Sequence, residues 1–262
     1  MKLELYKINA FTDSFNGGNP AGVIPLDHWL PDEQMQAIAK ENNYSETAFC
    51  IQNDNDYDLR WFTPGCEVDL CGHATVAAAF VLSTIKEVDQ PSYVFNTRSG
   101  RLIVTKTGEQ LTLDMPANAL TETSCPPCIF EGIGVTPTAS YKTDDYMIVI
   151  EDEEFLENLR PNYSALKKID ARGTIVTAPS QKPGVDFVSR WFGGPDVGID
   201  EDPVTGSAHA TLVPYWSERL NKQSLQAVQC SQRKGVLACN NDGDRVQVSG
   251  GAILYFSGHI FI

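Results

Sequence analysis

Two stretches of the chain share one order of apolar and polar positions. Residues 60–80 read RWFTPGCEVDLCGHATVAAAF, and residues 190–214 read RWFGGPDVGIDEDPVTGSAHATLVP. Each begins with an apolar run typical of a strand, passes through a turn with acidic residues, and continues into small residues typical of a helix. From the arginine to the glycine before the helix there are 12 positions in the first stretch and 16 in the second. The second needs only a longer loop, so the chain is predicted to contain two copies of one unit.

The first half of the chain shows short apolar runs around one apolar helix. Strands are expected at residues 3–11, 23–26, 44–51, 57–63, 93–96, 102–106 and 111–115, and helices at 31–40 and within 71–82. The proline and acidic residues that begin the segment 31–40 are typical of a helix N-terminus. The second helix is rich in alanine on all sides from Ala74 to Ala79. We therefore expect a sheet to enclose it.

The second half repeats this order after a polar, proline-bearing linker at residues 121–127. Helical segments are expected near residues 128–132, 153–159, 163–168 and 207–220, and strands at 146–150, 173–178, 186–192, 225–230, 235–239, 245–248 and 252–262. The length suits one large or two ordinary domains, and the repeat favours two. We place the halves at residues 1–118 and 119–262.

Composition and charge narrow the classes of partner. Hydrophobic residues make up 42% of the 262 residues and charged residues 21%, which is typical of a folded, soluble protein. The formal net charge is −14 and the pI is near 4.6. So acidic a surface disfavours nucleic acid or an anionic membrane as a partner. A small anionic substrate would need local positive features.

The N-terminus and the cysteines bear on the compartment. The sequence MKLELYKINAF lacks the apolar core of a signal peptide, and no apolar run approaches membrane-spanning length, so we expect a cytoplasmic protein. The seven cysteines lack the dense pattern of a disulfide scaffold. Cys125 and Cys128 have two prolines between them and no second pair of ligands. We interpret them as part of the linker and expect no metal site.

The two helix starts are the strongest candidates for chemistry. A glycine before a helix lets the backbone approach a ligand, and the first turn offers free N–H donors at the positive end of the helix dipole. Two such ends facing each other would bind an anion. The alternative is that these glycines serve only tight turns. Polar or reactive side chains at both helix starts favour a functional cleft: Cys71, His73, Asp202, Thr205 and Ser207.

Glu46 begins the strand expected at residues 44–51, directly after the helix terminator Asn42-Asn43. Its side chain can point into whatever cleft that junction borders. The alternative is a solvated edge glutamate, which is the usual place for this residue type.

Four separated motifs together resemble the phenazine-biosynthesis PhzF-like isomerase family, within the wider diaminopimelate epimerase-like fold. They are GGNPAGV, NNYSETAF, RWFTPGCEVDLCGHAT and GIDEDPVTGSAHA, and they span nearly the whole chain in the family's order. The resemblance implies an α+β fold of two pseudo-symmetric halves, each a β-barrel-like sheet around a central helix, with the active site between them. It also implies a homodimer, and the apolar terminal strand 252–262 is hard to leave as an exposed edge. The alternative is that this strand pairs within the chain.

The resemblance also implies roles for individual residues. Glu46 matches the family's catalytic acid/base, and His73 and Asp202 match its further polar site residues. The positions that match substrate-holding residues are Gly72, Gly206 and Ser207, with Ser45 as a weaker match. The implied activity is a cofactor-independent isomerisation that moves a proton within a small carboxylated metabolite. An enclosed carboxylate can take a proton from carbon, and a histidine or acid can hydrogen-bond the developing enolate. This chemistry requires no metal or organic cofactor.

Two other functions remain open on the sequence. In a two-thiol racemase or epimerase, Cys71 would be one thiol, but the facing position aligns with Thr205, whose hydroxyl is far too weak an acid. A non-catalytic protein could keep the cleft to bind a metabolite. A pure anion binder, however, gains nothing from Glu46 or Asp202, which favours the enzyme.

Overall fold

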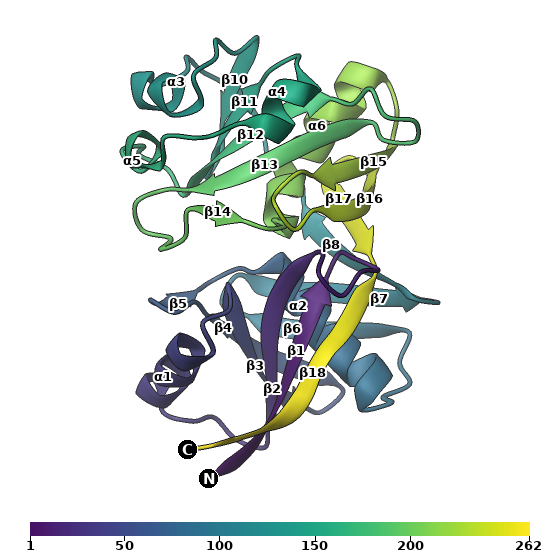
Figure 1. The fold of residues 1–262 in the computed structure, drawn as a ribbon. Coiled ribbons are helices and arrows are strands. Elements are labelled where there is room, and N and C mark those ends of the chain that lie inside the picture. The colour runs from purple at the N-terminus through teal and green to yellow at the C-terminus, as the bar shows by residue number, and fades with distance from the viewer. The chain divides into compact units, whose positions relative to one another are not determined.

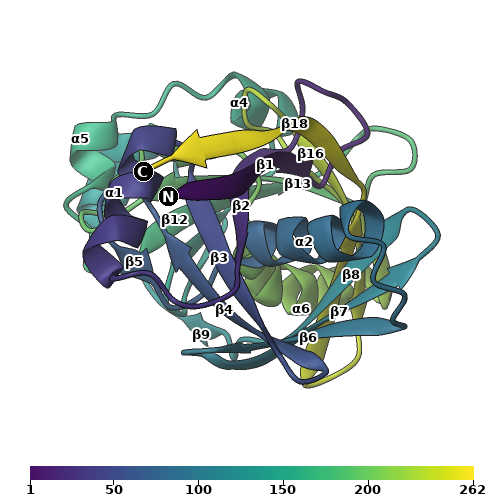
Figure 2. The same cartoon turned by 90° about the horizontal axis from the view of Figure 1, so that it is seen from below.

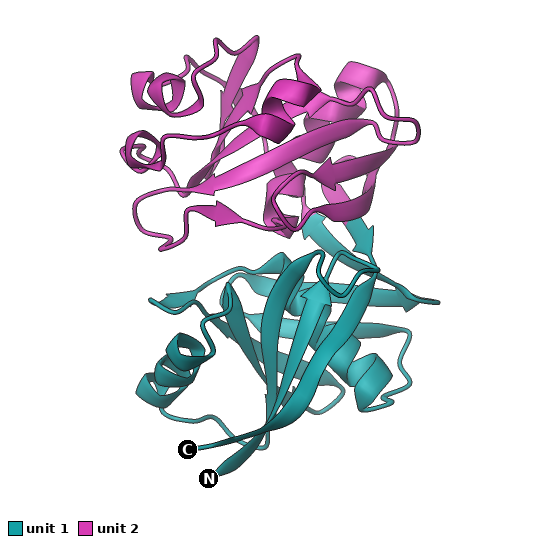
Figure 3. Ribbon diagram, viewed as in Figure 1, with its two compact units in different colours: residues 1–115, 248–262 teal, residues 116–247 magenta.

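The computed structural model describes residues 1–262 and divides into two compact units (Figure 3). Unit 1 comprises Met1–Met115 and Val248–Ile262, and unit 2 comprises Pro116–Gln247. The sequence places residues 248–262 in the second half. In the structure this segment lies in unit 1, because β18 (Ala252–Phe261) pairs antiparallel with β1 (Lys2–Ala10) along its length. None of the helices has the length and apolar character of a membrane span.

Unit 1 is a strand-rich unit with two α-helices (Figure 1). Besides β1 and β18 its strands are β2 (Asn19–Leu26), β3 (Glu46–Asn53), β4 (Asp56–Phe62), β5 (Glu67–Val68), β6 (Ser92–Thr97), β7 (Gly100–Thr107) and β8 (Gln110–Pro116). The helices are α1 (Asp32–Asn42) and α2 (Gly72–Phe80), and α2 continues into a π-helical turn, η1 (Val81–Ile85). Acidic residues fill the first turn of α1, and Asn43 ends it in the left-handed conformation (φ 51°).

Unit 2 is also built mainly from strands, but it has more helices. Its strands are β9 (Thr121–Glu122), β10 (Ala139–Lys142), β11 (Tyr146–Val149), β12 (Gly173–Pro179), β13 (Phe187–Gly193), β14 (Glu201–Asp202), β15 (Ser224–Gln229), β16 (Gly235–Asn241) and β17 (Arg245–Gly250), which runs on into unit 1. Its helices are α3 (Pro127–Ile133), α4 (Glu153–Asn158), α5 (Tyr163–Leu166), a 3₁₀ turn η2 (Gly206–Ala208) and α6 (His209–Leu220).

The strand pairing follows one pattern in both units. In unit 1 the order β1, β2, β3, β4, β6, β7 alternates between antiparallel and parallel pairs, starting with an antiparallel pair. In unit 2 the order β10, β11, β12, β13, β15, β16 shows the same alternation. The two-residue strands β5 and β14 pair antiparallel with β4 and β13, at equivalent places. This repeated topology is the duplication that the Arg-Trp-Phe stretches predict.

Helix α2 lies among the strands of unit 1, packed against β1, β2 and β3 (Figure 2). All of its residues from Gly72 to Ala79 are buried, and all of its alanines are fully inaccessible. A helix without a polar face is stable in water only when enclosed. Its small side chains let the strands approach closely, as the alanine run predicts.

An arginine–glutamate fork holds the turn before each central helix. Arg60 on β4 donates from Nε and Nη2 to the two carboxylate oxygens of Glu67 on β5, at 2.7 and 2.8 Å. Arg190 on β13 donates in the same way to Glu201 on β14, again at 2.7 and 2.8 Å. Bidentate pairs of this kind fix direction as well as distance. The two forks therefore set the path of the chain toward η2 and α2 in the same way.

Strand β18 leaves several large apolar side chains exposed. Leu254, Tyr255, Phe256 and Phe261 are between 39% and 78% exposed. A long apolar strand on a surface is a common site of association between chains. We predict that the protein forms a homodimer through β18.

The dimer is tested by light scattering at micromolar concentration. We expect the wild type to show twice the mass of 28.8 kDa, and Phe256→Glu to show the single mass, because two like charges would meet in an apolar contact. Val236→Glu changes an equally apolar residue that is 58% exposed on β16 of unit 2, and should leave the dimer intact. A monomeric wild type would contradict the prediction.

Candidate functional site

His73 lies in the first turn of α2 and is only 3% exposed. Its Nδ1 is 3.1 Å from Nδ2 of Asn19 and 3.4 Å from Sγ of Cys71, the residue just before the helix. Its Nε2 is 3.1 Å from Oε2 of Glu46. Each ring nitrogen of this buried histidine therefore faces polar neighbours.

Glu46 is the first residue of β3, where it pairs in register with Ala21 of β2. Its side chain is 14% exposed, so it is not a solvated edge glutamate. The contact between Glu46 Oε2 and His73 Nε2 has an ion-pair distance but lacks hydrogen-bond alignment. The structure thus brings together two of the predicted site residues and leaves the polar atoms between them without a satisfied bond.

The charges around His73 set its protonation. Burial disfavours the charged ring, but Cys71 and Glu46 more than offset this, and the pKa of His73 is raised well above its ordinary value. Burial, together with the charge of Glu46, raises the pKa of the Cys71 thiol to about 11. The thiol is therefore neutral near pH 7, so its charge does not act on His73 at that pH, and Glu46 is the charged neighbour of the ring.

Glu46, Cys71 and His73 are also residue types that bind zinc, and one ligand atom of each lies within 4.8 Å of the others. Cys71 approaches Nδ1 of the histidine ring, whereas Glu46 approaches Nε2. The two neighbours therefore approach different nitrogens of the same ring.

Asn19 is a site residue that the sequence analysis missed. It is fully buried at the start of β2 and bridges Ser45 and His73: Ser45 Oγ donates to Asn19 Oδ1 at 3.2 Å, and Asn19 Nδ2 faces His73 Nδ1. Ser45 therefore reaches the histidine through Asn19. The motif GGNPAGV contains the residue, but its glycines and proline indicate only a turn, not a contact with a histidine.

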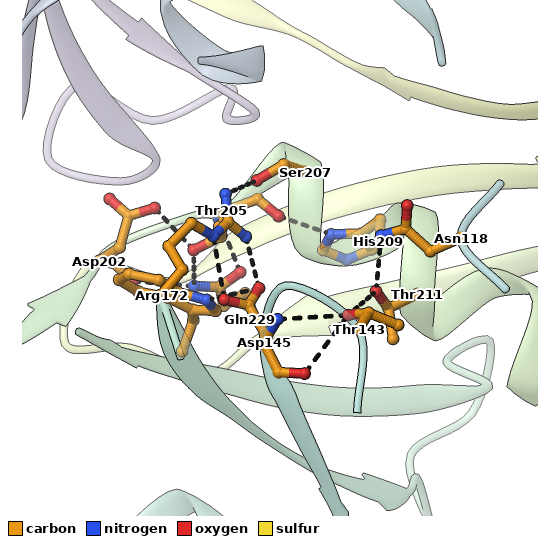
Figure 4. Close-up of polar contacts among 11 residues, drawn as sticks. Asn118, Thr143, Asp145, Arg172, Asp202, Thr205, Ser207, His209, Thr211 and Gln229 are labelled. Atoms are coloured by element: carbon orange, nitrogen blue, oxygen red, sulfur yellow. Dashed lines mark hydrogen bonds and ion pairs between the residues drawn. The ribbon is translucent and has the colours of Figure 1, made fainter. Parts of the chain in front are cut away.

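In unit 2, Asp202 lies on β14 and is buried (Figure 4). Its Oδ2 accepts a hydrogen bond of 2.6 Å from Thr205 Oγ1. Gln229, fully buried on β15, donates from Nε2 to Thr205 Oγ1 and to the backbone carbonyl of Asp202, and accepts from the backbone N–H of Thr205. Thr205 therefore holds Asp202 in place.

Ser207 is held by different partners. Gly206 and Ser207 are the first residues of η2, as Gly72 is the first residue of α2. The hydroxyl of Ser207 accepts a hydrogen bond of 2.9 Å from Nη1 of Arg172. Arg172 in turn forms a bidentate ion pair with Asp145, which also accepts a bond from Trp191 Nε1. The sequence gives no local signal for Arg172, Asp145 or Gln229.

A second buried histidine, His209, begins α6. It is completely inaccessible, and its Nδ1 donates to the carbonyl of Thr205 at 3.0 Å. Burial lowers the pKa of His209 to about 4. This ring is therefore neutral, and its pKa is shifted in the opposite direction from that of His73.

The two histidines predict opposite pH effects on stability. Between about pH 6.5 and pH 4 the unfolded chain takes up a proton at His209 that the folded protein refuses, so stability falls by up to about 3 kcal/mol. In His209→Gln this loss should be absent, so the free energy of unfolding should fall less steeply with acid than in the wild type. Urea unfolding at about pH 7 and about pH 4.5 measures the two slopes. Equal slopes would contradict the assignment.

His73 should act in the other direction. Because its folded pKa is raised, its contribution is fully present below the unfolded pKa of 6.5 and is lost as the pH rises through the folded pKa. His73→Gln should therefore be most destabilised, relative to the wild type, at the acid end of the same series.

Comparison with known proteins shows which family the chain resembles. The family model described as Phenazine biosynthesis-like protein matches residues 8–258. An uncharacterized isomerase of Pseudomonas aeruginosa is 51% identical over 264 residues and covers 100% of both chains. A PhzF-family phenazine biosynthesis protein of Enterococcus faecalis, of known crystal structure, has a TM-score of 0.95 at 44% identity, with 100% of both chains covered.

The wider fold is shown by more distant structures. A hydroxyproline epimerase of Agrobacterium vitis is 9% identical, with 99% of this chain and 92% of that chain covered at a TM-score of 0.60, and shares the fold alone. These likenesses confirm the predicted α+β, diaminopimelate epimerase-like fold. The chain belongs to the phenazine biosynthesis-like, or PhzF, family.

Proposed function

We propose that this protein is an isomerase that moves a proton within a small carboxylated metabolite, with Glu46 as the acid/base and without a cofactor. The observation that carries the proposal is the pair formed by Glu46 and His73, a largely buried carboxylate 3.1 Å from a buried imidazole. Membership of a family with relatives named isomerases supports the reaction class.

The chemistry follows from the two side chains. A carboxylate oxygen of Glu46 takes a proton from a carbon next to an unsaturated or carbonyl group, so that a C–H bond breaks and an O–H bond forms. The electron pair moves onto a substrate oxygen, and a ring N–H of His73 can donate a hydrogen bond to it. Glu46 then returns the proton to another carbon. No electron is gained or lost overall.

Residues of unit 2 are proposed to bind the same substrate. Asp202 is fixed by Thr205, and Ser207 is fixed by Arg172, so both side chains are rigidly held polar groups. The backbone N–H groups at Gly72, Gly206 and Ser207 are proposed to hold its carboxylate.

The thiol mechanism gains no support from the geometry. Raising the pKa of Cys71 to about 11 removes the thiolate that a base would need. Thr205, at the matching position of unit 2, donates its hydroxyl proton to Asp202. A non-catalytic binding protein is the remaining alternative, and an exchange experiment distinguishes it from the enzyme.

The first test replaces the proposed base. Glu46→Gln keeps the size of the side chain but removes its basicity, so exchange of substrate hydrogen with heavy water should fall by at least roughly a hundredfold while binding persists. Small unsaturated and amino carboxylic acids are screened for deuterium incorporation by mass spectrometry. Glu41→Gln, an exposed glutamate at the end of α1, serves as the control. If no acid in the screen exchanges with the wild type, the proposed proton transfer on this class of substrate is wrong.

The second test concerns the thiol. Cys71→Ser should retain substantial exchange activity, because Cys71 is a neutral neighbour of His73 in this proposal. Cys66→Ser removes an exposed thiol and controls for oxidation during the assay. Loss of exchange in Cys71→Ser together with full exchange in Glu46→Gln would replace the carboxylate mechanism with a thiol mechanism.

A further inference from the structure

The repeated topology identifies which residue of unit 2 stands where the base stands in unit 1. Arg60 lies opposite Phe49 in the β3–β4 pair, and Arg190 lies opposite Val176 in the β12–β13 pair. Counting back along β3 and β12 from these partners, Glu46 corresponds to Gly173. The residue before it, Ser45, corresponds to Arg172. The second unit thus carries an arginine and a glycine where the first carries a serine and a glutamate.

The side chain of Arg172 is held on three sides (Figure 4). Its Nε and Nη2 bind the two oxygens of Asp145, whose side chain is only 2% exposed. Its guanidinium also lies over the ring of Trp191, 5.5 Å from the centroid. Gly173 makes room for that ring, since a Cβ at this position would lie 2.3 Å from it. These contacts leave the guanidinium one orientation.

The direction of the next hydrogen bond is fixed by chemistry. An arginine can only donate, so in the 2.9 Å contact with Arg172 Nη1 the hydroxyl oxygen of Ser207 must accept. The proton of that hydroxyl is then available as a donor, and it has no acceptor within the protein. Of the five N–H groups of Arg172, three are used by Asp145 and Ser207. The rest, on a side chain that is 35% exposed, also lack a protein acceptor.

We propose that Arg172 is a positioning residue that fixes Ser207 as a hydrogen-bond donor to a carboxylate oxygen of the ligand. The proposal rests on the proposed function in taking that ligand to be the substrate. Because Asp145 pairs with the charge of Arg172, the arginine supplies direction more than net positive charge. A ligand with an ionised carboxylate is then preferred over its neutral ester, which is a poorer acceptor.

The experiment measures binding in protein that carries Glu46→Gln, so that turnover does not interfere. The ligands are the acid that exchanges in the screen and its methyl ester, or benzoate and methyl benzoate if none exchanges, titrated by ligand-observed NMR. Arg172→Met should weaken binding of the acid by roughly tenfold or more and leave the ester nearly unchanged. Arg172→Lys keeps a donor and should restore part of the loss. Arg160→Met removes an exposed arginine of unit 2 and controls for the lost charge.

A double-mutant cycle separates positioning from general damage. Once Ser207→Ala has removed the hydroxyl, Arg172→Met should weaken acid binding little further, since the arginine acts through that serine. Three results would each overturn the proposal. Arg172→Met could weaken binding of the acid and of the ester equally, or its loss could add to that of Ser207→Ala. The third is that the protein without either substitution binds the acid no more tightly than the ester. If the acid is preferred over the ester and no substrate exchanges, the site stands and the proposed isomerisation fails.

Discussion

The enclosure of helix α2 is the constraint on which unit 1 depends. A helix with alanine on all sides has no face that water can solvate, so strands must cover it from several directions. Its first turn is buried with the rest, and His73 is therefore withdrawn from solvent together with the alanines. A buried imidazole needs polar partners, and Asn19, Cys71 and Glu46 supply them. The candidate chemistry is thus a consequence of how the core is packed.

The two units share their strand topology and differ in the polar side chains near their central helices. Both units keep the arginine–glutamate fork, because the fork fixes the hairpin that leads into the central helix whatever follows it. The side chains beyond the fork differ: unit 1 places a carboxylate beside a histidine, whereas unit 2 holds Asp202 through Thr205 and Gln229. The two units therefore share a backbone topology but carry different polar side chains on it.

Sequence reasoning succeeded where the signal is local. The apolar runs located β3 and β4 within a few residues, and the alanine run located α2. It failed where a residue's partner is distant in the chain: Asn19 meets His73 across 54 positions, and Arg172 meets Asp145 across 27. Neither asparagine nor arginine has a spacing that marks such contacts. Residues 248–262 were assigned to the second half for the same reason, because no local pattern shows that β18 pairs with β1.

The pairing of β1 with β18 also has a consequence for the order in which the protein is made. Unit 2 is continuous in sequence, so all of it has been synthesised before β18 emerges. β1 precedes unit 2 in the chain, yet β18, the strand that pairs with it, follows unit 2. The second unit can therefore complete its own pairing during translation before β18 is available to pair with β1.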